Sequence, residues 1–466
     1  MRMTRQTAVS ATNRFGLGAR PGELAGLAGL ADPQGWLLAQ LHPGAPPAAL
    51  AGLPTSLEVL QQDIALQQAR REARQNGGDK PTGLVKALRQ GQVRELALRH
   101  QVAVESQASF VERMVRFWSN HFAVSLDKPV AAPYAAPMER EAIRPHVIGR
   151  FGELLLAVET HPAMLRFLDN ARSVGADSMV AMRARRRNPD KAPGLNENLA
   201  REILELHTVG ANGGYTQADV TELAKAITGW GVPMPQDFKR GQVHSAFVFR
   251  ANAHEGGART VMGKRYPQAG MDQGKAVLAQ LAVHPATARH VSSKIARHLI
   301  SDAPPPGVVE AMTRAWLKTD GDLASVYATL IRHPAAWGAQ ARKFKTPDDF
   351  VVSALRAGGR PDDRRPQALA TLLNRMGQPT LTPRSPAGFE DDAAQWSGPD
   401  ALWKRVQSAQ ALAEAVPEAL LDPLGTAQAV FADTLDADTL TALRRAESPR
   451  DGLALLFASP AFQWRT

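Results

Sequence analysis

The sequence contains no cysteine, few aromatic residues and no long apolar run. Without cysteine, the chain forms no disulfide, thiolate zinc site or iron–sulfur cluster, and it has no cysteine nucleophile. Phe, Trp and Tyr make up only 6% of the residues, and no basic platform interleaved with aromatics is present to stack single-stranded nucleic acid. We therefore expect no nucleic-acid partner, although the net charge of +10 favours anionic polymers or surfaces in general.

Neither a membrane-spanning segment nor a secretory signal is visible in the sequence. No window approaches the roughly 20 apolar residues that a transmembrane helix needs. The first residues, MRMTRQTAVSATNRF, lack the apolar core of a signal peptide. We expect a cytoplasmic location, with export to the periplasm alongside a partner protein as the alternative.

The composition favours helices over strands. Ala, Leu and Arg dominate long stretches of the 466 residues, so we predict a mainly α fold, a multi-helical bundle-like array. A small extended or β insertion is expected around residues 243–266, where apolar and polar residues alternate. We predict an N-terminal helical region (1–105), a central helical core (106–345) and a C-terminal helical region (346–466), integrated into one unit.

Several local features can be predicted from periodicity and turn residues. Two polar helices are expected over residues 57–75 and from 84 through 121, and their basic side chains are predicted to form a solvated face. These basic residues are Arg70, Arg71, Arg74, Lys86, Arg89, Arg94 and Arg99. Residues 171–195 are interpreted as an exposed loop, and the Pro- and Gly-rich segment 377–396 is long enough to wrap a surface or cover a pocket.

Three His-Pro-Ala segments occur at residues 161–163, 284–286 and 333–335, and each opens a helical pattern. Proline in the first turn of a helix loses no hydrogen bond, and the residue before it is placed to cap the helix. We therefore predict that these three histidines are structural.

The densest polar chemistry lies in residues 196–230, NENLAREILELHTVGANGGYTQADVTELAKAITGW. We call this stretch the central motif. Two short helices are predicted, joined by a glycine-rich turn whose residues tolerate positive φ. Thr216 and Asp219 have the spacing of a capping box at the start of the second helix.

The first helix of the central motif gathers several polar residues on one face. On a helical wheel, Asn198, Glu202 and Glu205 share that face, with Arg201 at its margin. His207 projects roughly opposite Glu205. A histidine partner for the two glutamates must therefore come from another segment.

Two histidines elsewhere are the candidates for that role. His121 follows Asn120 near a predicted helix end, after an aromatic residue, and this pair could present two hydrogen-bonding groups to a pocket. His254 and Glu255 lie in a Gly-rich loop, where functional groups are often found. The structural alternative for His121 is a buried ring paired with a backbone carbonyl.

Several segments together resemble the bacterial domain-of-unknown-function family 1800, in family order from about residue 10 to 463. Besides the central motif they are RFGLGARPGE, FWSNHFAVS, HEGGARTVMGKRYP, HPATARHVSSKIARHLISDAPP, FKTPDDFVVSALRAGG, NRMGQPTLTPRSPAGF and LLFASPAF. The resemblance implies a mostly helical fold and a sulfatase-like neighbour as partner, but no agreed activity. Glu255 stands where the family's His-Asp pair has aspartate.

Two functions compete on this sequence. In the first, a carboxylate-dependent hydrolase-like enzyme acts on a polymer or ester, with Glu202 and Glu205 as an acid/base pair and His121 or His254 completing the site. The orienting residues would be Asn120, Asn196, Asn198 and Arg201. A divalent metal would also suit such a site, although the spacing Glu-x-x-Glu differs from the Glu-x-x-His of di-iron proteins. In the second, the chain is a non-catalytic helical partner or binding protein for the sulfatase-like neighbour, and the Glu/Arg/Asn cluster is a structural network.

Overall fold

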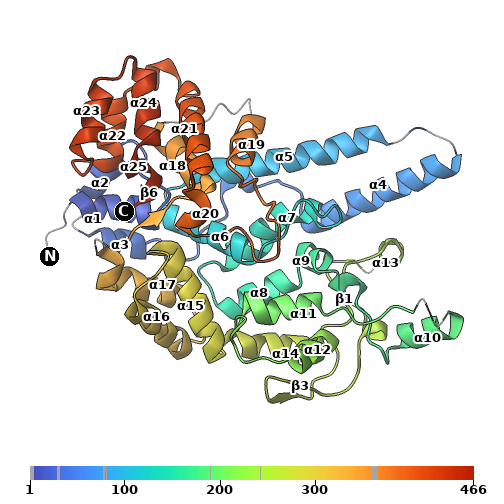
Figure 1. The fold of residues 1–466 in the computed structure, drawn as a ribbon. Coiled ribbons are helices and arrows are strands. Elements are labelled where there is room, and N and C mark those ends of the chain that lie inside the picture. The colour runs from blue at the N-terminus through green and yellow to red at the C-terminus, as the bar shows by residue number, and fades with distance from the viewer. Residues whose placement is uncertain are drawn as a thin grey trace.

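The computed structural model describes residues 5–28, 32–76, 79, 81–188, 190, 192–241, 243–338, 340–358 and 366–466. Within these ranges the chain is mainly helical, as predicted, with only short antiparallel strand pairs (Figure 1). None of the helices described is long and apolar enough to cross a membrane.

The helices follow one another along the chain in three groups. The first group is α1 (Arg5–Ser10), α2 (Glu23–Ala28), α3 (Pro33–Leu38), α4 (Ser56–Asn76), α5 (Thr82–Glu105), α6 (Ser109–His121), α7 (Ala132–Met138), α8 (Phe151–Glu159) and α9 (Pro162–Phe167). The middle group is α10 (Met179–Arg187), α11 (Asn198–Glu202), α12 (Gln217–Ala226), α13 (Pro235–Lys239), α14 (Met271–Ala282), α15 (Pro285–Leu299), α16 (Pro306–Lys318) and α17 (Leu323–Arg332). The last group is α18 (Pro347–Gly358), α19 (Pro366–Arg375), α20 (Ala393–Trp396), α21 (Pro399–Glu414), α22 (Pro423–Phe431), α23 (Ala437–Arg444), α24 (Pro449–Ala458) and α25 (Pro460–Gln463).

Three pairs of short antiparallel strands tie distant parts of the chain together. They are β1 (Trp230–Gly231) with β2 (Val248–Phe249), β3 (Arg259–Val261) with β4 (Lys264–Tyr266), and β5 (Lys343–Phe344) with β6 (Trp464–Arg465). The extended insertion predicted around 243–266 is confirmed by β2, β3 and β4. The third pair joins the last residues of the chain to the segment that leads into α18.

Two hydrophobic cores organise the helices. The larger core is built mainly by α6, α8, α11, α12 and α14 to α17, and Trp118, Trp230 and Trp316 are almost completely buried in it. The smaller core is built by α1, α2, α18 and α21 to α25, together with the end of α5. In Figure 1 the C-terminal helices of the smaller core, drawn in red, gather at one end of the molecule.

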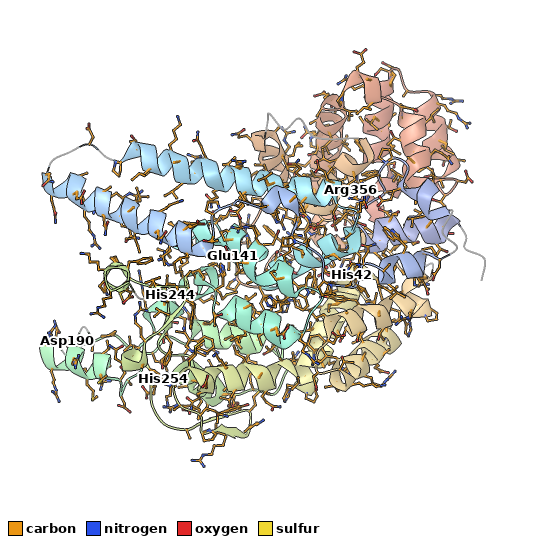
Figure 2. The ribbon with its side chains drawn as sticks, turned by 180° about the vertical axis from the view of Figure 1, so that it is seen from behind. His42, Glu141, Asp190, His244, His254 and Arg356 are labelled. Carbon is orange, nitrogen blue, oxygen red and sulfur yellow. The ribbon has the colours of Figure 1, made fainter. Side chains whose placement is uncertain are left out.

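The continuous helix predicted from residue 84 to 121 is wrong, because three residues separate α5 from α6. Arg356 of α18 is buried at this break and donates from one guanidinium nitrogen to the carbonyl groups of Ala103, Val104 and Ser106, each at 3.0 Å (Figure 2). A tertiary contact thus captures carbonyl groups at the helix end, where they lack intrahelical partners. The break lets α5 end in the smaller core while α6 enters the larger one.

Helices α4 and α5 form an arm that projects from the body (Figure 1). The predicted solvated face is confirmed for six of its residues, whose side chains are exposed: Arg70, Arg71, Arg74, Lys86, Arg89 and Arg94. For Arg99 the prediction is wrong, because its side chain is buried and its Nε donates to Glu139 at 2.6 Å. The arm is therefore basic and exposed toward its tip, but anchored at its base by a buried ion pair.

Local capping predictions are confirmed. The Nδ1 atoms of His161, His284 and His333 each accept a hydrogen bond from the second backbone N–H after the histidine, at 3.2 to 3.3 Å. Thr216 and Asp219 form the predicted capping box at the start of α12. The exposed loop expected over residues 171–195 is wrong in part, since α10 forms there.

Candidate functional site

A cavity of about 230 Å³ lies where the two core-bearing parts of the molecule meet. Residues from α5, α6, α15, the start of α18 and the segment 377–392 line it; we call that segment the strap and the space the polar cavity. Its charged and imidazole side chains are Arg99, Arg113, Arg116, His121, Lys294, Arg297, His298, Asp348, Asp349, Glu390 and Asp391. The segment 377–396 was predicted to wrap a surface or cover a pocket, and its residues between Gln378 and Asp391 contribute to the lining of this cavity.

Helix α6 presents one face to the larger core and another to the polar cavity. Its core face carries the fully buried Phe110, Met114 and Trp118. Its cavity face carries Arg113, Arg116, Phe117 and Asn120. Both sets recur with helical spacing, so the apolar set fixes the rotation of α6 and thereby directs the polar set into the cavity.

His121, at the end of α6, also lines the cavity and has a defined tautomer. Its Nε2 lies 3.2 Å from the carbonyl oxygen of His207. Because a carbonyl only accepts, Nε2 carries the proton and Nδ1 of the neutral ring is an acceptor. Burial, with Lys294, His207 and His290 nearby, holds the pKa of His121 well below its usual 6.5, so the neutral form prevails. Among the described residues Nδ1 has no hydrogen-bond partner.

Helix α15 brings three basic side chains toward the site at positions i, i+4 and i+8. They are His290, Lys294 and His298. Burial lowers the pKa of Lys294 from 10.5 to about 8. In the part of the chain that the structure describes, no carboxylate lies within 4 Å of its Nζ. His298 is instead bonded through Nδ1 to Asp391, at 2.9 Å.

The buried carboxylates at the cavity already have cationic partners. Burial alone would raise the pKa of Asp348, but Arg116 and His100 outweigh it and hold that pKa well below its usual value. Asp349 lies 3.0 Å from Arg113. Asp391 lies 2.9 Å from His298 and 3.7 Å from the ammonium of Lys343. In both, the nearby cations more than offset the effect of burial and lower the pKa. The negative charges of these three aspartates are therefore neutralised within the protein.

Asn120 fixes the strap over the cavity. Its Nδ2 donates to the carbonyl of Phe389 and its Oδ1 accepts from the N–H of Phe389, both at 2.8 Å. The adjacent Gly388 has a φ of 85°, and a Cβ there would collide with the carbonyl oxygen of Asn120. Only glycine fits this close approach without displacing the backbone. The role observed for Asn120 is therefore to orient the strap.

The family model described as protein of unknown function (DUF1800) matches residues 10–464. The chain belongs to the DUF1800 family. No curated protein and no solved structure matches the chain. The match spans both hydrophobic cores, the arm and the strap, so the polar cavity lies wholly within the DUF1800 region.

The two glutamates predicted as an acid/base pair lie on α11 and the π-helical turn that follows it, outside the lining of the polar cavity of this DUF1800 chain. Both are half-buried. Burial, together with Glu205 and Glu159 nearby, raises the pKa of Glu202 above its usual value. Glu205 accepts a hydrogen bond from Tyr215 at 3.0 Å. The structure thus keeps the glutamates near each other, and the lining of the polar cavity contains His121 but neither glutamate nor His254.

The other polar residues of the central motif form a network at the surface. Arg201 donates to Gln217 at 2.7 Å and reaches Glu197 at 3.4 Å. The side chain of Asn196 accepts from the N–H of Asn198 at 2.9 Å. These contacts tie α11 to α12 and to the preceding loop, in accord with a structural role for the cluster.

His207 belongs to the core rather than to the glutamate face. Its ring and Glu159 are both completely buried, with Nδ1 2.8 Å from Oε1. The π-helical turn Ile203–His207 directs this ring into the core. The backbone carbonyl oxygen of His207 accepts a hydrogen bond from Nε2 of His121. The central motif therefore contributes to the polar cavity through backbone and buried support rather than through its surface glutamates.

His254 supports the loop in which it lies. Its Nδ1 is 3.0 Å from the carbonyl oxygen of Thr228, and it does not line the polar cavity. In Figure 2 it lies far from Arg356, on the opposite side of the view. Glu255 is buried and accepts from the N–H of Asp177 at 3.0 Å. Both residues thus hold a surface loop together.

The sequence did not single out most of the cavity residues. The helical spacing within ARHVSSKIARHLI, which places Lys294 and His298 on one face, was present as a signal. So were the paired aspartates of FKTPDDF. In the described ranges no group of three or more His, Asp or Glu side chains is arranged to hold a metal ion.

Proposed function

We propose that the polar cavity binds a small ligand carrying an acidic group, with Lys294 as its anchor. The observation that carries this proposal is the charge balance of the lining. Asp348, Asp349 and Asp391 each pair with a cation, which is Arg116, Arg113 and Lys343 respectively. No described carboxylate, in contrast, lies within 4 Å of Lys294 Nζ. Burial outweighs the attraction of Asp391 and Glu390, which act on Lys294 from beyond 4 Å. A ligand acid in direct contact would therefore stabilise this partly buried ammonium.

The remaining polar groups at the cavity indicate further features of the ligand. Nη2 of Arg116 is buried and has no partner among the described residues, so a second donor accompanies Lys294. Nδ1 of His121 is an acceptor without a partner in the same part of the chain. An acid that also carries a hydroxyl or amide N–H would match both kinds of group. The volume of about 230 Å³ lies below the roughly 300–1,000 Å³ of pockets for drug-sized ligands and favours a small molecule or a chain end.

Binding fits His121 better than proton transfer does. A general base is most effective when its pKa lies near the working pH. Burial and three neighbouring basic groups hold the pKa of His121 well below 6.5, so its Nδ1 is a weak base. Its role in the proposal is therefore to accept a hydrogen bond from the ligand.

A carboxylate-dependent hydrolase acting on a polymer or ester is the second candidate function. The observation that favours it is the raised pKa of Glu202 beside Glu205, since acid/base pairs rely on such splitting. Hydrolysis of ester and polysaccharide substrates by the wild type and by Glu202→Gln tests this candidate. Equal activity in both would eliminate it. The partner role for a sulfatase-like neighbour remains a separate proposal that does not depend on either site.

The test of the binding proposal is thermal stabilisation by acids. The panel contains acetate, lactate, glucuronate, a sugar phosphate and a sugar sulfate, each with its uncharged counterpart. We expect at least one acid to raise the melting temperature of the wild type, and no effect on Lys294→Met. Lys318→Met is the matched control, because Lys318 is exposed on α16. If the acids act equally on the wild type and Lys294→Met, the anchor is elsewhere and the proposal fails.

A further inference from the structure

The arm formed by α4 and α5 concentrates the charge of the molecule. Residues 67–94 contain seven Lys and Arg against two Asp and Glu. This net charge of +5 is half of the +10 of the whole chain, within 28 residues. Figure 1 shows that the arm projects away from both core-bearing parts. A projecting, strongly basic element attracts anionic partners electrostatically and is accessible to them ahead of the rest of the molecule.

The charged side chains near the tip of the arm differ in their pairing from those at its base. At the base, two acids of the arm pair with cations of neighbouring elements: Glu95 with Arg140 at 3.2 Å and Asp63 with Arg166 at 2.9 Å. Toward the tip the described cations are exposed, and no described carboxylate lies within 4 Å of any of them. They are Arg70, Arg71, Arg74, Lys86, Arg89 and Arg94. The base is thus neutralised internally, whereas the tip retains its charge for an external partner.

A groove lies between the two helices near the tip, with a volume of about 660 Å³. Its lining combines cations with apolar or small side chains. The lining residues are Arg70, Ala73, Arg74, Pro81, Thr82, Val85, Lys86 and Arg89. No acidic side chain is among them. Val85 is 39% exposed and the neighbouring Leu84 is 45% exposed, so apolar surface is open beside the charge.

We propose that this groove binds an acidic polypeptide segment in which apolar residues alternate with Glu or Asp. Charge complementarity selects an anionic partner. The apolar lining selects one with aliphatic side chains, which polysaccharides and lipid headgroups lack. Residues 56–105 contain no Phe, Trp or Tyr, so the arm offers no ring on which a nucleic-acid base would stack. A concave groove between helices also fits a chain better than a flat bilayer surface.

Fluorescence anisotropy with the full chain tests the electrostatic part of this proposal. The probe is a labelled synthetic peptide of repeated Glu-Leu-Glu-Ala, with the Gln-for-Glu peptide as its neutral counterpart. Arg70→Glu combined with Arg89→Glu is expected to weaken binding of the acidic peptide by about tenfold or more. Arg444→Glu combined with Arg445→Glu changes the net charge equally at exposed positions outside the arm. An equal loss in both double variants would overturn the assignment to the arm.

The apolar part of the proposal has its own matched pair. Val85→Ser alters the groove lining, whereas Leu84→Ser alters an exposed aliphatic residue that does not line it. We expect weaker peptide binding for Val85→Ser than for Leu84→Ser. Equal binding by the two variants would show that the apolar lining of the groove does not contribute to binding, and the proposed preference for apolar residues in the peptide would then be wrong. Binding to phosphatidylserine vesicles but not to the acidic peptide, or binding to neither probe, would overturn the proposal.

Discussion

Lys294 places an ammonium group at the polar cavity, where burial lowers its pKa from 10.5 to about 8. Methionine has a similar unbranched stem without the charge. Replacing Lys294 with Met is therefore expected to stabilise the ligand-free protein while removing its response to acidic ligands. Removing a lysine that is paired within the protein would instead destabilise the fold, so the combination separates an anchor for a ligand from a structural lysine.

The size of the stabilisation follows from the pKa. At roughly 1.4 kcal/mol per pKa unit, a fall from 10.5 to about 8 corresponds to about 3 kcal/mol of lost stability at pH 7. Lys294 is only partly shielded from solvent, and screening through the cavity reduces this figure. We expect the free energy of unfolding of Lys294→Met to exceed that of the wild type by about 1–3 kcal/mol at pH 7.

The pH dependence gives a second signature of the same effect. Between pH 8 and 10.5 the unfolded wild type binds a proton at Lys294 that the folded wild type has released. Stability attributable to this residue therefore rises with pH across that window. Urea denaturation of the wild type and Lys294→Met at several pH values should show the gap closing as pH rises, because the variant has no such proton to lose.

Two outcomes would contradict this expectation. A variant that is less stable than the wild type at pH 7 would show that the ammonium has a stabilising partner in the protein. A gap that does not change between pH 7 and 10.5 would show that its pKa is not lowered. Lys318→Met, at an exposed site on α16, should change neither stability nor pH dependence by more than about 0.5 kcal/mol.

Three further predictions concern the strap and the central motif. Gly388→Ala should lower the free energy of unfolding in urea by more than about 1 kcal/mol, because φ is positive at this position and an added Cβ would collide with Asn120. Gly44→Ala, in an exposed loop with open space around the Cα, should be nearly neutral. Asp391→Asn removes the carboxylate that pairs with α15, so trypsin should cleave faster at the exposed Arg384 of the strap; an unchanged rate would mean that the pair does not hold the strap. The pKa of Glu202 is raised in the folded protein, so the folded state binds this proton more tightly than the unfolded state does. As pH rises from 4.5 through the raised pKa, the stability of the wild type should therefore fall relative to that of Glu202→Gln. Parallel profiles of stability against pH for the two proteins would contradict this.

Capping was predictable from the sequence because it depends on neighbouring residues. A histidine before proline is placed by the local backbone to accept from the second N–H that follows, and His161, His284 and His333 all do so. The same holds for the capping box of α12. Helix α4, predicted over residues 57–75, is observed from Ser56 to Asn76, since the residues that define its pattern and its flanking turns lie within one short window.

Burial of charge was not predictable in the same way. Arg99 has the same local pattern as the exposed arginines of the arm, yet it is buried against Glu139, 40 residues later in the chain. At the break after α5, carbonyl groups accept hydrogen bonds from Arg356, about 250 residues away. A helical wheel places a side chain on one face of a helix, but it does not predict which other segments pack against that face.

The helical class, the helix caps, the membership of a family and the position of a segment able to cover a pocket are all contained in the amino-acid sequence. They follow from local backbone preferences and from patterns along the chain. The lining of the pocket by α5, α6, α15, α18 and the strap is a property of the folded molecule alone. The same is true of the position of Lys294, whose Nζ has no described carboxylate within 4 Å. Counterions and cavities arise from packing, because segments far apart in the chain must meet before a charge can be called paired or unpaired.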